Sequence, residues 1–171
     1  MRYRFFLVLS ISVLVLGVCV VAGAQTADEW NVRGDNLYDA GDFNKAIECY
    51  TKAIELDFEL ILAYFSRASA YSNLARYEEA VVDYTKAIEL SPDFASLYGN
   101  RGAAYNELGR YEDALADLNK AIELDQGYAG AYNNRGYAYY MLGNVKMARD
   151  DFGKACEMGF EAACENYRAI K

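Results

Sequence analysis

Small and apolar side chains recur along residues 27–162 with a helical spacing. Ala46, Tyr50 and Ala53 are separated by four and three residues, which places them on one face of a helix. The same pattern returns at every 34th residue, with Leu118 and Phe152 in two of the places that tyrosine takes elsewhere. We therefore expect helices at residues 43–56, 77–90, 111–124 and 145–158.

Another helical segment precedes each of these and starts near an aromatic residue. These first helices are expected at residues 30–40, 64–74, 98–108 and 132–142. A small residue that can close a helix follows each one. These four closing residues are Gly41, Ala75, Gly109 and Gly143.

The two segments together form a repeating unit. The stretch Tyr98–Ala114 recurs 34 residues upstream and downstream, and a more divergent copy opens the series at Trp30. A fixed period between 20 and 50 residues is typical of repeat proteins, whose helical pairs gain stability by stacking on one another. Four copies, at residues 27–60, 61–94, 95–128 and 129–162, make up most of the chain.

Small residues face each other within every copy. Gly34, Ala68, Gly102 and Gly136 on the first helices recur opposite Ala46, Ala80, Ala114 and Ala148 on the second. Side chains this small on both helices predict a close approach of the two backbones.

Residues 1–24 have the features of a signal peptide. Arg2 and Arg4 precede an apolar run from Phe5 to Val21, and Ala22-Gly23-Ala24 supplies the small-x-small cleavage pattern. We expect cleavage before Gln25 and export to the periplasm or the outside of the cell. An uncleaved anchor and a lipoprotein modified at Cys19 are the alternatives.

The charge balance changes with the leader. Removing Arg2 and Arg4 lowers the basic count from 17 to 15 against 25 acidic residues, which gives a net charge of −10. A surface of this sign repels nucleic-acid phosphates and anionic lipids, so we expect no nucleic-acid partner and no membrane binding after cleavage.

The residue types needed for catalysis are poorly represented. The chain has no histidine, no glycine-rich phosphate loop and no Cys-x-x-Cys pair, and its paired carboxylates sit near helix starts or on exposed faces. We therefore expect neither enzyme activity nor a cofactor or metal site.

One charged pair repeats with the period. An arginine occurs in every first helix and an aspartate at a constant distance in three second helices. The arginines are Arg33, Arg67, Arg101 and Arg135, and the aspartates are Asp83, Asp117 and Asp151. An ion pair within each repeat is favoured over a basic ladder that grips an acidic ligand. In the first copy Cys49 takes the acidic position, and Glu48 is expected to substitute.

The aromatic, glycine and alanine positions at this period, with Tyr-Thr-Lys-Ala-Ile-Glu-Leu at residues 50–56 and 84–90, resemble the tetratricopeptide repeat. The resemblance covers all four copies. It implies an all-α, right-handed solenoid of four helix-turn-helix repeats at residues 25–171, closed by a cap at 163–171. It also implies a concave groove, lined by the first helices, for a protein or peptide.

Placed on the family pattern, the groove positions come from all four first helices. They are Asn31, Asp35, Tyr38, Phe65, Ser69, Asn73, Asn100, Asn106, Asn133, Asn134, Tyr137 and Met141. Asn100 and Asn134 lie one period apart, as in relatives whose asparagine ladder holds a peptide backbone, although a solvated polar face is the alternative. The family's clamp for C-terminal carboxylates needs lysine and arginine here, and neither is present.

The C-terminal segment resembles the cysteine-containing Sel1-like relatives of this repeat. Gly159 ends a helix, residues 161–170 form a short capping helix, and the resemblance implies a disulfide between Cys156 and Cys164. Two buried thiols are the alternative, and Cys49 is expected to be a packed free thiol.

These expectations define a non-catalytic envelope scaffold that binds a partner in its groove. A regulatory or assembly subunit that docks through the convex face is the alternative. Self-association through the uncovered first copy near Trp30 is a further possibility.

Overall fold

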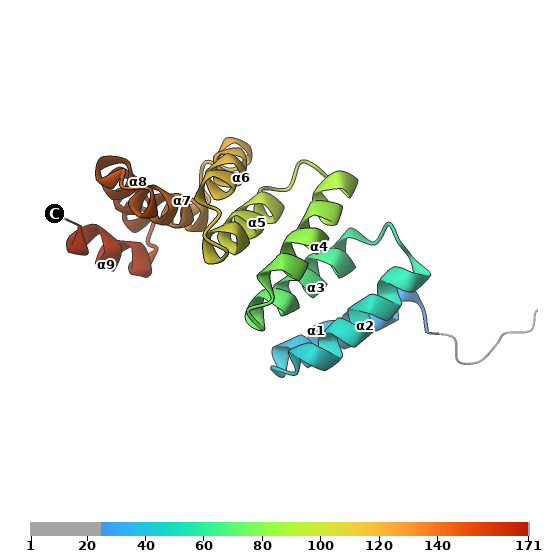
Figure 1. Ribbon diagram of the computed structural model, residues 1–171. Coiled ribbons are helices and arrows are strands. Elements are labelled where there is room, and N and C mark those ends of the chain that lie inside the picture. Colours follow the sequence, from blue (N-terminus) through green and yellow to red (C-terminus); the bar gives the residue numbers. More distant parts are fainter. Residues whose placement is uncertain (1–24, 171) are drawn as a thin grey trace, which may run out of the picture.

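The computed structural model describes residues 25–170, and within this range it contains nine α-helices and no β-strand. Eight helices form four hairpins that follow one another in an elongated stack, and a short ninth helix lies at the far end (Figure 1). The first helices are α1 (Ala27–Asp39), α3 (Ile61–Asn73), α5 (Ala95–Glu107) and α7 (Ala129–Met141). The second helices are α2 (Phe43–Leu56), α4 (Tyr77–Leu90), α6 (Tyr111–Leu124) and α8 (Val145–Glu157), and the last helix is α9 (Glu161–Ala169). The expected signal peptide lies outside the described residues.

The expected bounds of the second helices are confirmed for α2, α4 and α6, and α8 ends one residue early. The first helices each begin three residues before the aromatic that the sequence suggested as their start. In α1 the reason is a capping box, in which the Glu29 N–H donates to the Thr26 hydroxyl at 3.2 Å and the Thr26 N–H donates to the Glu29 carboxylate at 3.0 Å. The aromatic therefore lies about one turn inside the helix.

Each first helix ends at a residue in the left-handed backbone region, as the small residues predicted. The φ angle is +78° at Gly41, +72° at Gly109 and +80° at Gly143. Ala75 occupies the equivalent place with a φ of +56°, and it is the one non-glycine residue with positive φ among residues 25–170. Because its Cβ disfavours this conformation, Ala75 carries backbone strain that the glycines avoid.

The small residues of the first helices make room for a large side chain from the second helix. A Cβ atom at Gly34 would lie 2.4 Å from a ring carbon of Tyr50, and one at Gly102 would lie 2.7 Å from Cγ of Leu118. The Gly102 position is also 3.3 Å from the backbone oxygen of Ala114, so the expected close approach of the two helices is present.

The recurring arginine forms the expected pair within its own repeat. In the third repeat the Arg101 guanidinium donates to both carboxylate oxygens of Asp117, at 2.7 and 2.8 Å. It also donates to the Thr85 hydroxyl of the preceding repeat at 2.9 Å. Arg101 therefore joins three helices from two repeats.

The same three-way contact occurs in the flanking repeats. Arg67 contacts Asp83 and Thr51, and Arg135 contacts Asp151 and Asn119. The first repeat differs, because Glu48 is exposed and Arg33 has no ion pair among residues 25–170. The expected substitution by Glu48 was wrong. The Arg33 guanidinium instead lies 5.2 Å from the centre of the Trp30 ring.

The two ends of the stack are closed differently. Internal first helices bury Ala63 and Ala70, or their counterparts, against the preceding repeat. In α1 the same places hold the exposed Glu29 and Asn36, so the outer face of the first repeat is polar. At the other end α9 packs on α8 through Ala163, which closes the last core cluster.

Candidate partner-binding groove

The first helices lie along one side of the stack. Consecutive first helices contact one another, whereas consecutive second helices are kept further apart. The first helices therefore form the inner side of the curve, where three neighbouring cavities open on α1, α3 and α5.

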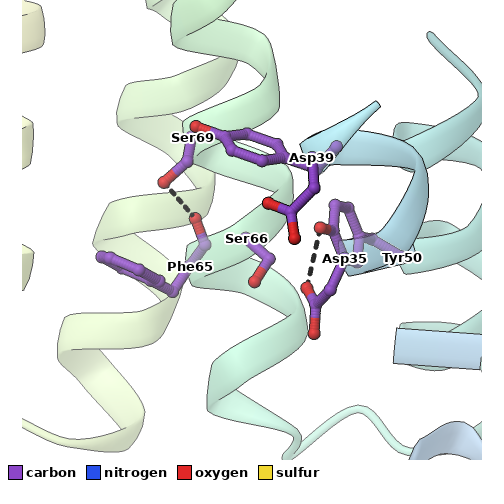
Figure 2. Close-up of a pocket in the computed structure, with 7 residues that line it drawn as sticks. Asp35, Asp39, Tyr50, Phe65, Ser66 and Ser69 are labelled. Carbon is purple, nitrogen blue, oxygen red and sulfur yellow. Dashed lines mark hydrogen bonds between the residues drawn. The ribbon is translucent and has the colours of Figure 1, made fainter. Parts of the chain in front are cut away.

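The cavities share walls and form one continuous surface, which we call the groove. The acidic cavity, of about 230 Å³, is lined by Asp35, Tyr38, Asp39, Tyr50, Phe65, Ser66 and Ser69 (Figure 2). The central cavity, of about 330 Å³, is lined by Tyr38, Ser69, Ser72, Asn73, Tyr77, Tyr84, Asn100, Ala103, Ala104 and Glu107. The apolar cavity, of about 380 Å³, is lined by Ile61, Leu62, Phe65, Phe94, Ser96 and Leu97.

Hydrogen bonds within the hairpin fix the floor of the acidic cavity. The Tyr50 hydroxyl donates to one oxygen of Asp35 at 2.8 Å, and the Asn31 amide donates to the other at 3.3 Å. Burial, reinforced by the neighbouring Asp35, raises the pKa of Tyr50, so its hydroxyl remains a donor. Asp39 is exposed one turn further along α1. Figure 2 shows both carboxylates beside the Ser66 side chain at the same hollow.

Two asparagine amides on the first helices could hold a peptide backbone: Asn100 lines the central cavity, and Asn134 takes the equivalent position on α7. Asn100 accepts a long hydrogen bond of 3.5 Å from the Tyr128 hydroxyl, and Asn134 accepts one of the same length from Asn133. Within residues 25–170 the side-chain NH₂ groups of Asn100 and Asn134 have no hydrogen-bond acceptor. Both rungs of the expected ladder can therefore donate to a carbonyl group of a ligand.

Several of the expected groove residues serve to hold the helices together. Asn31 and Asn106 are only 8% and 5% exposed, and the Asn106 side chain donates to the backbone oxygen of Asn134 at 2.8 Å. Asn73 donates to the Tyr38 hydroxyl at 2.8 Å, which links α1 to α3. Asn31 and Asn106 therefore support the groove from within, whereas Asn73 both joins two helices and lines the central cavity.

The expected residues of the fourth repeat lie next to the cap. Asn133 accepts a hydrogen bond from Asn166 of α9 at 3.2 Å. The Tyr137 ring packs edge-on against Tyr111 and lines a separate cavity of about 460 Å³ between α7, α8 and α9. Met141 is exposed at the end of α7. The structure thus brings together the residues of the first three repeats, with Asn134 beside them.

Sequence reasoning missed several residues that line the groove, among them two acidic and two apolar ones. Asp39 and Glu107 extend it on α1 and α5, and the spacing of four residues from Asp35 to Asp39 could have revealed the first of these. Leu62 lies three residues before Phe65 on α3, and Phe94 comes from the turn before α5. A pattern confined to helical positions could not have included Phe94.

The cysteines of residues 25–170 are arranged as the sequence predicted. Cys156 and Cys164 form a disulfide with a Cα–Cα distance of 4.7 Å, as the Sel1-like resemblance implied, and Cys49 is a buried free thiol. Across residues 25–170, no three acidic or cysteine side chains gather in a metal-binding cluster. None of the helices described by the structure combines the length and hydropathy required to span a membrane.

Two family models match the repeats of this chain. A model described as TPR repeat matches residues 34–74, 76–109 and 102–143, and one described as Tetratricopeptide repeat matches residues 129–158. The chain belongs to the tetratricopeptide repeat family. Its fold is a non-catalytic protein-interaction fold, and its helical hairpins form the solenoid that the repeats predicted.

This tetratricopeptide repeat chain resembles known proteins in structure or in sequence, each over a different part of its length. MamA (residues 41 to the end) from Desulfovibrio magneticus RS-1 has a TM-score of 0.74 at 20% identity, covering 78% of this chain and 75% of that one. The second TPR domain of human RPAP3, in complex with the HSP70 peptide SGPTIEEVD, has a TM-score of 0.64 at 32% identity, covering 66% and 93%. Hsp70-Hsp90 organizing protein 3 of Arabidopsis thaliana is 46% identical over 46 residues, which are 27% of this chain and 8% of that protein.

Proposed function

We propose that this protein is a non-catalytic scaffold of the cell envelope that holds an extended segment of a partner protein in its groove. The family relationship supports protein binding as the general activity. The observation that carries the groove assignment is the continuity of the three cavities, with the donor group of Asn100 in the central one and that of Asn134 in the next repeat. The envelope location rests on the leader-like sequence of residues 1–24.

The mode of binding differs from recognition of a carboxylate-rich tail. The human RPAP3 domain is in complex with a peptide that ends in Glu-Glu-Val-Asp. Among residues 25–170, no lysine or arginine lines any of the three cavities, so an acidic C-terminus would find no charged partner there. We infer that this groove holds the peptide backbone through neutral amides and selects a different class of side chain.

Capture from an envelope extract by the immobilised chain, residues 25–171, tests the groove. The variant Asn100→Ala/Asn134→Ala removes both donors, and we expect it to lose the partner that the unaltered chain retains. The matched control is Val82→Asp/Ala116→Asp, which changes exposed positions on the outward side of α4 and α6. We expect this control to retain the partner, with circular dichroism verifying that both variants are folded.

Docking through the convex face is the second candidate. Val82 is 67% exposed and borders a cavity of about 460 Å³ outside the groove. A regulatory or assembly subunit would use this surface, and then Val82→Asp/Ala116→Asp would lose the partner while Asn100→Ala/Asn134→Ala kept it. That result would overturn the groove proposal. Self-association through the first repeat has less support, because its outer face carries Glu29 and Asn36 where internal repeats have apolar residues.

A further inference from the structure

We propose that the groove selects an extended peptide that presents a cationic side chain next to a bulky aliphatic one. This inference rests on the proposed function, because it names the chemistry of the segment that the groove holds. It follows from two adjoining subsites with different linings, the acidic cavity and the apolar cavity, which lie on either side of Phe65.

The acidic cavity offers negative charge without a cation of its own. Asp35 accepts hydrogen bonds only from the neutral groups of Tyr50 and Asn31, and Asp39 forms no ion pair among residues 25–170. Glu107 adds a third carboxylate in the adjoining central cavity. Ser66 and Ser69 supply hydroxyl groups beside these acids. A lysine or arginine of a ligand could therefore pair with these carboxylates without displacing another cation. The chain's excess of acidic residues also favours the approach of a cationic ligand.

The apolar cavity offers aliphatic and aromatic surface that no part of residues 25–170 covers. Leu62 is 62% exposed and Phe94 is 56% exposed at its rim. Ile61 and Leu97 form its floor and belong to or pack against the core cluster around Tyr64 and Tyr84. A leucine-sized side chain would bury this rim and gain the corresponding hydrophobic free energy.

The Phe65 side chain forms the wall between the two subsites. Its ring packs against Tyr84 with centroids 6.0 Å apart, so the shared wall is anchored to the core. In an extended peptide, residues i and i+2 point to the same side, about 6.5–7 Å apart. A cation at position i and an aliphatic residue at position i+2 therefore face the same side of the peptide, as two subsites on either side of one ring require.

Binding of labelled octapeptides, followed by fluorescence anisotropy, tests this inference. The probe Lys-Ser-Leu-Ser-Lys-Ser-Leu-Ser places lysine and leucine on one side of a strand. We expect it to bind more tightly than Glu-Ser-Leu-Ser-Glu-Ser-Leu-Ser and than Lys-Ser-Ala-Ser-Lys-Ser-Ala-Ser. We also expect its affinity to fall as salt is added, because the charges lie near the surface. SGPTIEEVD, the peptide bound by the human RPAP3 domain, serves as a clamp-type control.

Matched variants assign the charge effect to the groove. Asp35→Asn/Asp39→Asn should weaken binding of the lysine–leucine probe about fivefold or more, since two ion pairs near the surface are lost. Glu48→Gln/Asp150→Asn removes the same charge from exposed sites on α2 and α8 and should change it less than about twofold. Leu62→Ala/Phe94→Ala should weaken binding of the leucine probe and leave the alanine probe nearly unaffected.

The outcomes separate this inference from the proposed function. Equal or tighter binding of the glutamate probe or SGPTIEEVD would overturn the inference, as would equal effects of the two charge variants. Absence of binding to every peptide would overturn it as well. The groove proposal would stand in each case if Asn100→Ala/Asn134→Ala still abolished partner capture while the convex control did not.

Discussion

Replacing Ala75 with glycine is predicted to stabilise the protein. Ala75 ends α3 with a φ of +56°, where the other three repeats have glycine at +72° to +80°. The backbone hydrogen bonds are the same in both settings: the Arg76 N–H donates to the Tyr71 oxygen at 2.9 Å, and the Arg110 N–H donates to the Tyr105 oxygen at 2.9 Å. The substitution therefore changes the strain and the freedom of the unfolded chain, and leaves the contacts of the turn intact.

The magnitude follows from two opposing terms. Holding an L-residue in the left-handed region costs roughly 1–2 kcal/mol, which glycine removes. Glycine also lowers the free energy of unfolding by roughly 0.4–1 kcal/mol, because it increases the conformational entropy of the unfolded chain. The net gain in the free energy of unfolding is about 0.5–1 kcal/mol, which corresponds to a rise in Tm of about 1–4 °C for a chain of this size.

The reciprocal substitution Gly109→Ala is the matched control. A Cβ at Gly109 would meet no atom within 4 Å, so its effect comes from the backbone alone. We expect it to lower the free energy of unfolding by about the amount that Ala75→Gly adds, since both act on the same turn of neighbouring repeats. Urea unfolding followed by circular dichroism measures both, and the double variant should lie near the parent. A neutral or destabilising Ala75→Gly would refute the assignment of strain to this turn.

Two more features predict measurable losses. Arg101→Met should lower the free energy of unfolding by about 3 kcal/mol in urea titrations, because it leaves the buried Asp117 without a cation. Arg33→Met should lower it far less, because Arg33 has no ion pair in the described chain. Equal losses from the two substitutions would contradict this explanation. Replacing both Cys156 and Cys164 with serine should cost roughly 2.5 kcal/mol, because the bridge closes a short loop between α8 and α9. Thiol counting on the denatured, unreduced chain of residues 25–171 should find one free thiol, that of Cys49, and a count of three would exclude the bridge.

The repeat period predicted most of the fold because its signals are local and recur. The spacing of Ala46, Tyr50 and Ala53 defined the buried face of a helix, and the residue at 41, 75, 109 or 143 defined the end of the preceding one. The starts of the first helices were less accurate because the aromatic, such as Trp30, lies one turn inside the helix. The capping signal that marks the true start, Thr26 with Glu29, occurs in α1 and depends on hydrogen bonds more than on hydrophobic spacing.

The groove was only partly predictable because neighbouring repeats share it. The position of Asn106 within its helix matches a groove site, yet the side chain turns to the backbone of Asn134 in the next repeat. Phe94 lies outside any helix and reaches the apolar cavity from a turn. The link from Arg101 to Thr85 likewise joins two copies, so a pattern taken within one copy shows only its bond to Asp117.

Because the outer face of α1 is polar, repeats can be removed or added only between the two end repeats of the solenoid. Excising residues 61–94 would join the second repeat's neighbours in register, keeping Glu29 and Asn36 at the water-facing beginning and α9 at the finish. Excising residues 27–60 would instead expose Ala63 and Ala70 to solvent. The apolar end so created could bind another molecule end to end. Designers who wish to shorten or lengthen this array should therefore work on its middle units and leave both outermost ones unchanged.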